Sequence, residues 1–411
     1  MANADTSGLS RLRRQWVFLG MIGGGYLLGA AGVLMGLLGA QPAARWGLLA
    51  ALVLAYVFLQ LGSALELNHP TDDPRLRPCL GAANLITLVR AVLTASLAGF
   101  LFQFPPVGTG PAWSWLPGVL YLAAAVMDYA DGFMARATGT VTRLGEFLDT
   151  EIDALGLLVA SLLLVSNERA PLAYLCVGFG YYGLQAAIRL RQAAGRPIAR
   201  VSPRAGARCT AGCEMGFAAA ALLPAFEPEV THPAAWVMAA GLIVSLGQDW
   251  LIICGYANPE GQPRGPALKI LQRALVRFLP LIVRAAVAAG VILILCNWPA
   301  DAAVPLPSGG AKIVFLAAGA LCALGVAARC AAMILSLVIA AWLAPAAPGI
   351  ISSGMLAAAL ILMLTGAGHP RLCQPEDRFL MTTQGKKRDP QWKTRIARKT
   401  SARKASTPWK L

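Results

Sequence analysis

Carboxylates gather in one short window of a chain that carries few charges elsewhere. The segment DYADGFMARATGTVTRLGEFLDTEID, residues 128–153, holds six of them, although only 13% of the 411 residues are charged. Asp128 and Asp131 stand at i and i+3, and Asp149 and Asp153 at i and i+4, so each pair shares one helix face. Oxygen donors with no neighbouring His or Cys suit Mg²⁺ or Mn²⁺. The window therefore predicts a divalent metal site.

Small residues and one guanidinium share the faces that carry these carboxylates. Gly132, Ala135 and Arg136 follow Asp128 at i+4, i+7 and i+8, and Gly145 opens the next apolar segment. Residues of this size let a ligand or a partner helix approach the backbone closely. The forked guanidinium of Arg136 suits a diphosphate. Carboxylate-bound metal ions beside an arginine are typical of phosphoryl or phosphatidyl transfer.

The elements that must position these residues are membrane helices. A chain with 57% hydrophobic residues and 42 glycines cannot be covered by the polar surface of a soluble globular protein. We predict an all-α, polytopic transmembrane helical bundle of about twelve spans. The predicted spans lie near residues 16–38, 46–66, 84–104, 113–136, 145–166, 171–190, 209–226, 234–255, 278–297, 311–328, 330–346 and 349–367. The pair that meets at Arg329 counts as one span or two, because we find no turn residue between its members.

Basic residues predict the orientation of this bundle. With the N-terminus inside, thirty of the 35 lysines and arginines fall on the cytoplasmic side. We therefore expect a multi-pass integral membrane protein, in a bacterial inner membrane, with the acidic window and both termini on the cytoplasmic side. Only eight residues separate Arg136 from Gly145, so the two helices form an antiparallel pair and four carboxylates converge between them.

Four regions follow from this pattern. We predict an N-terminal transmembrane hairpin (1–66), a six-span catalytic core (70–256), a C-terminal transmembrane region (278–367) and a basic, disordered cytoplasmic tail (371–411). The tail carries twelve Lys and Arg against three acidic residues. It follows a span directly and has no folded recognition motif, so we expect contact with anionic lipid headgroups and no nucleic-acid partner.

The motif positions resemble a known signature. The pattern D-x2-D-G-x2-A-R-x8-G-x3-D-x3-D, from Asp128 to Asp153, is similar to that of the CDP-alcohol phosphatidyltransferase family, and every fixed position matches. The segment NLITLVR, from Asn84 to Arg90, also resembles the opening of the family's first span. The resemblance covers roughly residues 70–256.

The resemblance implies an enzyme of phospholipid synthesis. It implies transfer of a substituted phosphate from a CDP-alcohol to an acceptor hydroxyl, with release of CMP and with Asp153 as the general base. It implies two divalent ions, Mg²⁺ or Mn²⁺, held by Asp128, Asp131, Asp149 and Asp153. It places four residues beside the CDP moiety: Gly132, Ala135, Arg136 and Gly145. The expected partners are CDP-diacylglycerol or a CDP-linked small alcohol, an acceptor alcohol and membrane lipids, with a second copy of the chain as a further candidate.

Several alternatives stay open at this point. In the basic loop at residues 189–208, Arg196, Arg200 and Arg204 are candidates for contact with an acceptor or lipid phosphate, although positive-inside topology alone would account for them. Arg90 either reaches the cytoplasmic interface or lies beside the site. A polytopic transporter that uses the acidic cluster as a cation site is the alternative function, although we find no internal repeat of the kind that transporters show.

Overall fold

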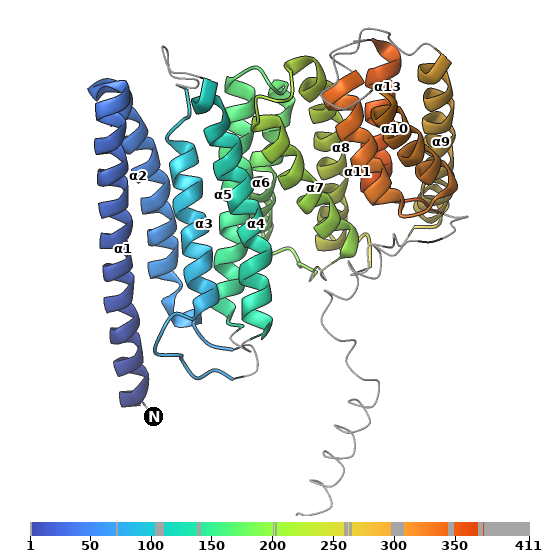
Figure 1. The fold of residues 1–411 in the computed structure, drawn as a ribbon. Helices are drawn as coiled ribbons and strands as arrows, with labels where there is room; N and C mark the ends of the chain where they lie inside the picture. The colour runs from blue at the N-terminus through green and yellow to red at the C-terminus, as the bar shows by residue number, and fades with distance from the viewer. Residues whose placement is uncertain are drawn as a thin grey trace, which may run out of the picture.

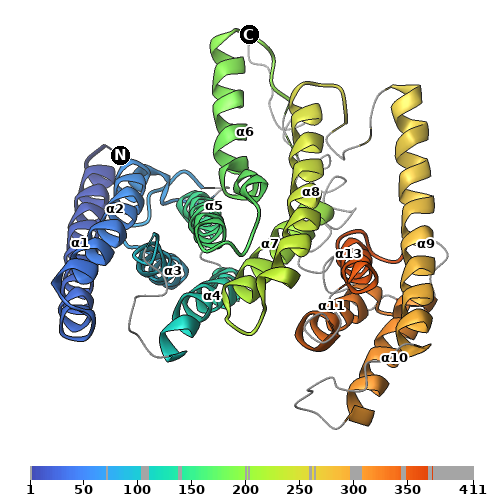
Figure 2. The same cartoon turned by 90° about the horizontal axis from the view of Figure 1, so that it is seen from above.

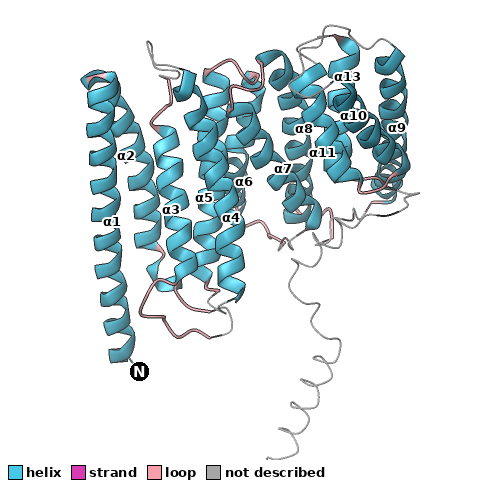
Figure 3. Ribbon diagram, in the orientation of Figure 1, coloured by secondary structure: helices cyan, strands magenta, loops and turns pink. Residues whose placement is uncertain are grey.

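The computed structural model describes most of the chain, and every regular element in the described part is a helix (Figure 3). The description leaves out residues 1, 71–72, 103–110, 138–140, 200, 202–203, 259–261, 263–264, 297–307, 344–348, 369–372 and 374–411. The predicted tail therefore lies outside the described residues, apart from Cys373. The prediction of an all-α fold is confirmed for the part of the chain that the structure describes.

The helices follow the apolar segments of the sequence. Their bounds are α1 (Ala2–Leu38), α2 (Ala40–Ser63), α3 (Ala82–Ala98), α4 (Leu116–Ala137), α5 (Arg143–Ser166), α6 (Leu175–Ala193), α7 (Ala205–Leu222), α8 (Pro228–Ile253), α9 (Pro266–Cys296), α10 (Ser308–Leu324), α11 (Ala328–Val338) and α13 (Ile350–Thr365). A π-helical turn, Ile339–Leu343, extends α11. Each predicted span overlaps one of these helices.

Within the part of the chain that the structure describes, four helices are long and apolar enough to cross a membrane. These stretches are Ser7–Leu38, Ala40–Ser63, Pro228–Ile253 and Gln272–Cys296. Length and composition of this kind indicate an integral membrane protein. The count of twelve crossings, the six-span core and the orientation stay predictions.

The boundary between α10 and α11 corrects one interpretation of the sequence. Gly325 has a φ of +70° and Ala327 a φ of +43°, so the backbone leaves the right-handed helical region there. A helix cannot continue through residues in this conformation, and glycine adopts it at little cost. The statement that no turn residue separates the two segments is therefore wrong, because Gly325 supplies the break and two helices result.

The helices stand side by side, and those of the N-terminal half follow the chain across the molecule, whereas α9 lies farther out than α11 and α13 (Figures 1 and 2). Figure 1 shows α1 and α2 at one side, α3 to α8 in the middle, and α9, α10, α11 and α13 at the other side. Seen from above, α3 lies between the N-terminal pair and the middle helices (Figure 2). α3 packs against α2, α4 and α5, whereas α4 and α5 make few direct contacts with each other. The predicted α4–α5 pair is thus separated by α3, and that helix enters the space where the carboxylates converge.

Small residues let the N-terminal pair dock closely on α3. The indole Nε1 of Trp46 on α2 donates a hydrogen bond to the carbonyl of Ser96, at 3.1 Å. A Cβ at Gly99 would lie 2.3 Å from the ring of Trp46, so only glycine fits at that position. Close packing of this kind stabilises helix pairs where lipid provides no hydrophobic driving force.

Candidate active site

The guanidinium of Arg90 lies among the four motif carboxylates. Its Nη1 is 2.8 Å from Asp131 Oδ2 and 2.7 Å from Asp149 Oδ1. Its Nη2 is 3.0 Å from Asp128 Oδ1 and also pairs with Asp153. Arg90 is 1% exposed. The structure therefore brings all four aspartates together around one cation, and Arg90 lies beside the site instead of reaching the cytoplasmic interface.

A polar stripe on α3 faces these carboxylates. Asn84, Thr87 and Arg90 follow one another at three-residue spacing in an otherwise apolar helix, and all three are buried. The Thr87 hydroxyl donates a hydrogen bond to Asp131 Oδ2 at 2.9 Å, in competition with a carbonyl of its own helix. Sequence reasoning missed Thr87. The signal that could have found it is this three-residue spacing of polar side chains in NLITLVR.

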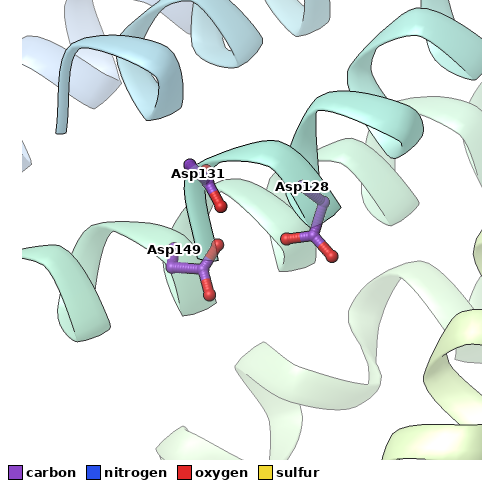
Figure 4. Close-up of side chains that lie close together, drawn as sticks. All are labelled: Asp128, Asp131 and Asp149. Atoms are coloured by element: carbon purple, nitrogen blue, oxygen red, sulfur yellow. The ribbon is translucent and has the colours of Figure 1, made fainter. Parts of the chain in front are cut away.

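Three of the carboxylates lie close enough to share a cation. Asp128 and Asp131 project from α4 and Asp149 from α5, toward a common space (Figure 4). One oxygen from each lies within 4.8 Å of the others. The exposed fraction of the side chain rises from 6% for Asp131 to 26% for Asp128 and 44% for Asp149. The cluster is therefore shielded from solvent where it packs against α3, and it is accessible beside Asp149.

Charge and donor type both suit a divalent cation here. Arg90 supplies one positive charge against four carboxylates, so the formal charge of the cluster is −3 when all four are ionised. Partly buried carboxylates without counter-charge repel one another, and a divalent ion relieves that repulsion. All the donors are oxygen atoms, as hard cations prefer. The described residues thus fit the predicted metal, and the choice between Mg²⁺ and Mn²⁺ stays open.

Asp153 lies one helical turn after Asp149 on α5. Its side chain is 32% exposed. Together with Arg90, Tyr121 and Met215 it borders a cavity of about 10 Å³, which is room for roughly one water molecule. A substrate cannot enter a space of this size.

Gly145 allows α5 to begin close to α3. Its backbone N–H donates to the hydroxyl of Thr142, which caps the helix, at 3.1 Å. A Cβ at this position would lie 2.8 Å from Asn84 Oδ1. Gly145 thus has a packing role that sets the position of α5, and hence of Asp149 and Asp153. Its predicted contact with CDP stays a prediction.

The other residues predicted to border CDP lie on α4. Gly132 is half-buried and follows Asp131 directly. The backbone of Ala135 and Arg136 continues the same helix. The side chains of these two residues are not among those the structure describes, so the predicted contact of Arg136 with a diphosphate is not tested.

The basic loop is divided between exposed and paired arginines. Arg196 is exposed, and Arg200 lies outside the described residues. Arg204 donates to Gln248 Oε1 and to Asp249 Oδ1, both at 2.5 Å, and so links the start of α7 to α8. A phosphate would have to displace these partners from Arg204. The predicted phosphate contacts stay predictions for all three arginines.

Glu151 lies on α5 between two motif aspartates but belongs to a different cluster. The hydroxyls of Tyr56 and Tyr181 donate to its two carboxylate oxygens at 3.1 and 2.7 Å. Glu151 therefore joins α2, α5 and α6, on a face of α5 away from Arg90. A residue spacing of two along a helix turns neighbouring side chains onto different faces, which accounts for this separation.

Comparison with known proteins identifies the region that carries the acidic cluster. Residues 80–247 match the model of the family described as CDP-alcohol phosphatidyltransferase. The match begins just before α3, includes all four aspartates and Arg90, and ends within α8. No curated protein and no solved structure matched the chain. Residues 80–247 are thus a domain of the CDP-alcohol phosphatidyltransferase family, which confirms the resemblance seen in the motif.

Proposed function

We propose that this protein transfers a substituted phosphate group from a CDP-alcohol to an acceptor hydroxyl and releases CMP. The observation that carries the proposal is the cluster of four aspartates around Arg90, negatively charged and open beside Asp149. The cluster lies within the family domain. Placement of the cluster on the cytoplasmic side, supported by the distribution of basic residues, would give it access to soluble nucleotides.

The carboxylates are suited to hold the metal that such a transfer needs. Asp128, Asp131, Asp149 and Asp153 would together hold two divalent ions, either Mg²⁺ or Mn²⁺, and the first three of them each place one oxygen within 4.8 Å of the others. When bound, the ions would supply charge neutralisation to the oxygens of the diphosphate.

The protein's own residues would orient the reactants. Arg90 holds the four carboxylates at fixed positions and favours their ionised form. Asp153 would accept the proton of the acceptor hydroxyl. The acceptor oxygen then forms a bond to the phosphorus beside the transferred alcohol, the bond from that phosphorus to the CMP oxygen breaks, and CMP leaves. Gly132, Ala135, Arg136 and Gly145 would border the CDP moiety, which their place on α4 and α5 supports.

A cation transporter is the alternative that the acidic cluster alone would also fit. The match of residues 80–247 to a transferase family favours the enzyme. The cavity next to Asp153, of about 10 Å³, is itself too small for a hydrated ion. We therefore propose the enzymatic function.

Release of CMP tests the proposal. Purified full-length protein would be incubated with CDP-dioleoylglycerol or CDP-choline, Mg²⁺ or Mn²⁺, and a panel of acceptor alcohols that includes dioleoylglycerol. We expect acceptor-dependent CMP release from one donor, lost in Asp153→Asn. Glu146→Gln is the matched control, because Glu146 is an exposed carboxylate on the same helix. Well-folded protein that released no CMP from either donor would contradict the proposal.

A further inference from the structure

Two buried donors beside Asp153 have no hydrogen-bond partner among the residues that the structure describes. They are the Nε–H of Arg90 and the hydroxyl of Tyr121 on α4. Arg90 is 1% exposed and Tyr121 is 2% exposed, so bulk water does not reach either donor. Buried donors in folded proteins are nearly always paired with a protein group or with bound water. These two donors therefore need an acceptor that the described residues do not provide.

Both donors line the same small cavity. This is the cavity of about 10 Å³ beside Asp153, and Thr94 of α3 also lines it. Three helices thus bring four polar side chains to a space with room for about one water molecule. A buried water molecule makes roughly two to four hydrogen bonds, so these side chains are enough to hold one.

We propose that this cavity holds one bound water molecule, which accepts hydrogen bonds from Arg90 and Tyr121 and donates one to Asp153. Tyr121 thereby positions Asp153 as the general base, a role that rests on the proposed function. Tyr121 precedes the acidic motif in the sequence and is not one of its fixed positions.

The groups around the cavity favour water over an ion. A metal ion cannot accept the hydrogen bonds that Arg90 and Tyr121 offer, and an anion would be repelled by the carboxylate of Asp153. A water molecule can accept both of these bonds. It can also donate to a carboxylate oxygen of Asp153 and to the hydroxyl oxygen of Thr94. Water thus satisfies both buried donors and uses all of its own hydrogen-bonding groups.

Glu214 on α7 is another acceptor near Tyr121. The two side chains interact electrostatically, and Glu214 Oε1 has no hydrogen-bond partner among the described residues. Glu214 Oε2 accepts a hydrogen bond from the hydroxyl of Tyr174 at 3.1 Å. Glu214 does not line the cavity, whereas Tyr121 lines it together with Arg90 and Asp153. The shared cavity favours water as the partner of the Tyr121 hydroxyl.

A bound water would restrict the orientation of the Asp153 carboxylate. One oxygen of Asp153, Oδ1, already pairs with Arg90. A hydrogen bond from a water that Tyr121 also holds would add a second point of attachment. A general base works best when it is held in reach of the proton that it accepts, and small displacements cost large factors in rate. Tyr121 would act through the water, without contact with the substrate, and is therefore a positioning residue.

Gly156 leaves the space in which this water would lie. It follows Asp153 by three residues on α5 and lines the cavity. A Cβ at this position would lie 3.5 Å from Tyr121 Cε2 and 3.9 Å from Thr94 Oγ1, which is ordinary van der Waals contact. Alanine therefore fits without displacing these side chains, and its methyl group occupies the place of the water. Gly156→Ala removes the water and keeps every hydrogen-bonding side chain.

Thermal unfolding in EDTA tests the water apart from turnover. Full-length Gly156→Ala is compared with Gly183→Ala on α6, where a Cβ meets nothing within 4 Å, so this control reports the general effect of alanine in a helix. We expect Gly156→Ala to unfold at a lower temperature than Gly183→Ala, because Arg90 and Tyr121 lose their acceptor. In a dry cavity the methyl group would fill unused space, and Gly156→Ala would unfold at the same or a higher temperature. That result would overturn the proposal.

Combination with Tyr121→Phe shows whether the two changes act on one water. Tyr121→Phe should lower the unfolding temperature less in the Gly156→Ala protein than in wild type, because the water is already displaced. Equal shifts in both backgrounds would contradict a shared water. A shift that disappears in Glu214→Leu instead would assign the hydroxyl to Glu214 and overturn the proposal. If Tyr121→Phe does not fold, the comparison of Gly156→Ala with Gly183→Ala decides alone.

Turnover tests the role in positioning. In the CMP assay, Tyr121→Phe and Gly156→Ala should each lower kcat about tenfold and change KM by less than about twofold, since neither residue contacts the substrate. The double variant should lose no more than the larger single effect. Tyr181→Phe is the matched control, because its hydroxyl donates to Glu151 outside this cavity.

The two readouts separate the water from the proposed function. CMP release by wild type with unchanged kcat in Tyr121→Phe and Gly156→Ala would overturn the positioning role and leave the function standing. The expected unfolding shifts, with no CMP release by wild type from any donor, would overturn the function and the positioning role and leave the water site standing.

Discussion

In the acidic cluster, each of the four aspartates pairs with the guanidinium of Arg90. By contrast, a cavity of about 890 Å³ between α7, α8, α11 and α13 is lined almost wholly by apolar side chains and small residues. The two regions adjoin at Asp128 and Tyr129 on α4. One holds charged groups at fixed positions, and the other holds open space.

The two regions therefore differ in what a substitution is expected to change. Charged groups at membrane depth are costly unless they are paired, so the cluster carries its own counter-charge and allows little movement. The residues that line the cavity include Gly216, Ala220 and Leu360 and no carboxylate. A change in the cluster should therefore act on charge, chemistry and stability, and a change in the cavity on packing.

The largest effect is expected when a proposed metal ligand loses its charge. Asp149→Asn removes the most exposed of the three carboxylates that share the common space. Mn²⁺ affinity, measured by calorimetry, should fall by more than about 100-fold, since even residues behind the ligands are worth ~10–100-fold. Glu146→Gln should leave it unchanged. Equal Mn²⁺ affinity in Asp149→Asn and wild type would show that the cluster does not bind the metal.

The next effect concerns the counter-charge of the cluster. Arg90→Gln leaves four carboxylates facing one another without a cation, and breaking a buried ion pair costs about 3–5 kcal/mol. The thermal unfolding temperature should fall. Added Mn²⁺ should raise it more in the variant than in wild type, because the ion replaces part of the lost charge. An unfolding temperature that changes neither with Arg90→Gln nor with added Mn²⁺ would contradict the role given to Arg90.

A smaller effect should follow from crowding between α3 and α5. Gly145→Ala places a Cβ 2.8 Å from Asn84 Oδ1, so one of the two helices must shift. We expect a loss of about 1–3 kcal/mol in the free energy of unfolding, with reduced CMP release because Asp149 and Asp153 move with α5. Gly183→Ala, where the space is open, serves as the control. Unchanged stability and turnover in Gly145→Ala would show that this contact does not position α5.

The smallest effect is expected at Glu151, the carboxylate on α5 that lies outside the acidic cluster. Tyr181→Phe removes one of the two hydroxyls that donate to Glu151. It should cost about 1 kcal/mol in the free energy of unfolding and leave turnover unchanged. Loss of CMP release in a folded Tyr181→Phe protein would mean that Glu151 acts together with the four aspartates after all.

Local patterns predicted the helices and the acidic motif well. Apolar segments became helices, and the spacing of Asp128, Asp131, Asp149 and Asp153 placed them in one cluster, because both depend on helical periodicity. The left-handed backbone at Gly325 was overlooked because a single glycine within an apolar run is a weak signal.

Contacts between distant helices could not be predicted in the same way. Nothing in the α4–α5 connection indicates that α3 enters between these helices, or that Arg90 meets all four carboxylates. The cavity depends on how α7 packs beside α11 and α13, more than a hundred residues later in the chain. Such packing depends on the shapes of whole helices, which residue spacing does not report.

The central claim is that the cluster around Arg90 carries out metal-dependent transfer from a CDP-alcohol. Its most direct test is CMP release by the purified full-length protein with Mg²⁺ or Mn²⁺, and after removal of divalent ions with EDTA. We expect acceptor-dependent CMP release with at least one of the two ions, its loss in EDTA, and its return when the ion is restored. CMP release that continues at the full rate in EDTA would contradict metal-dependent transfer at this cluster.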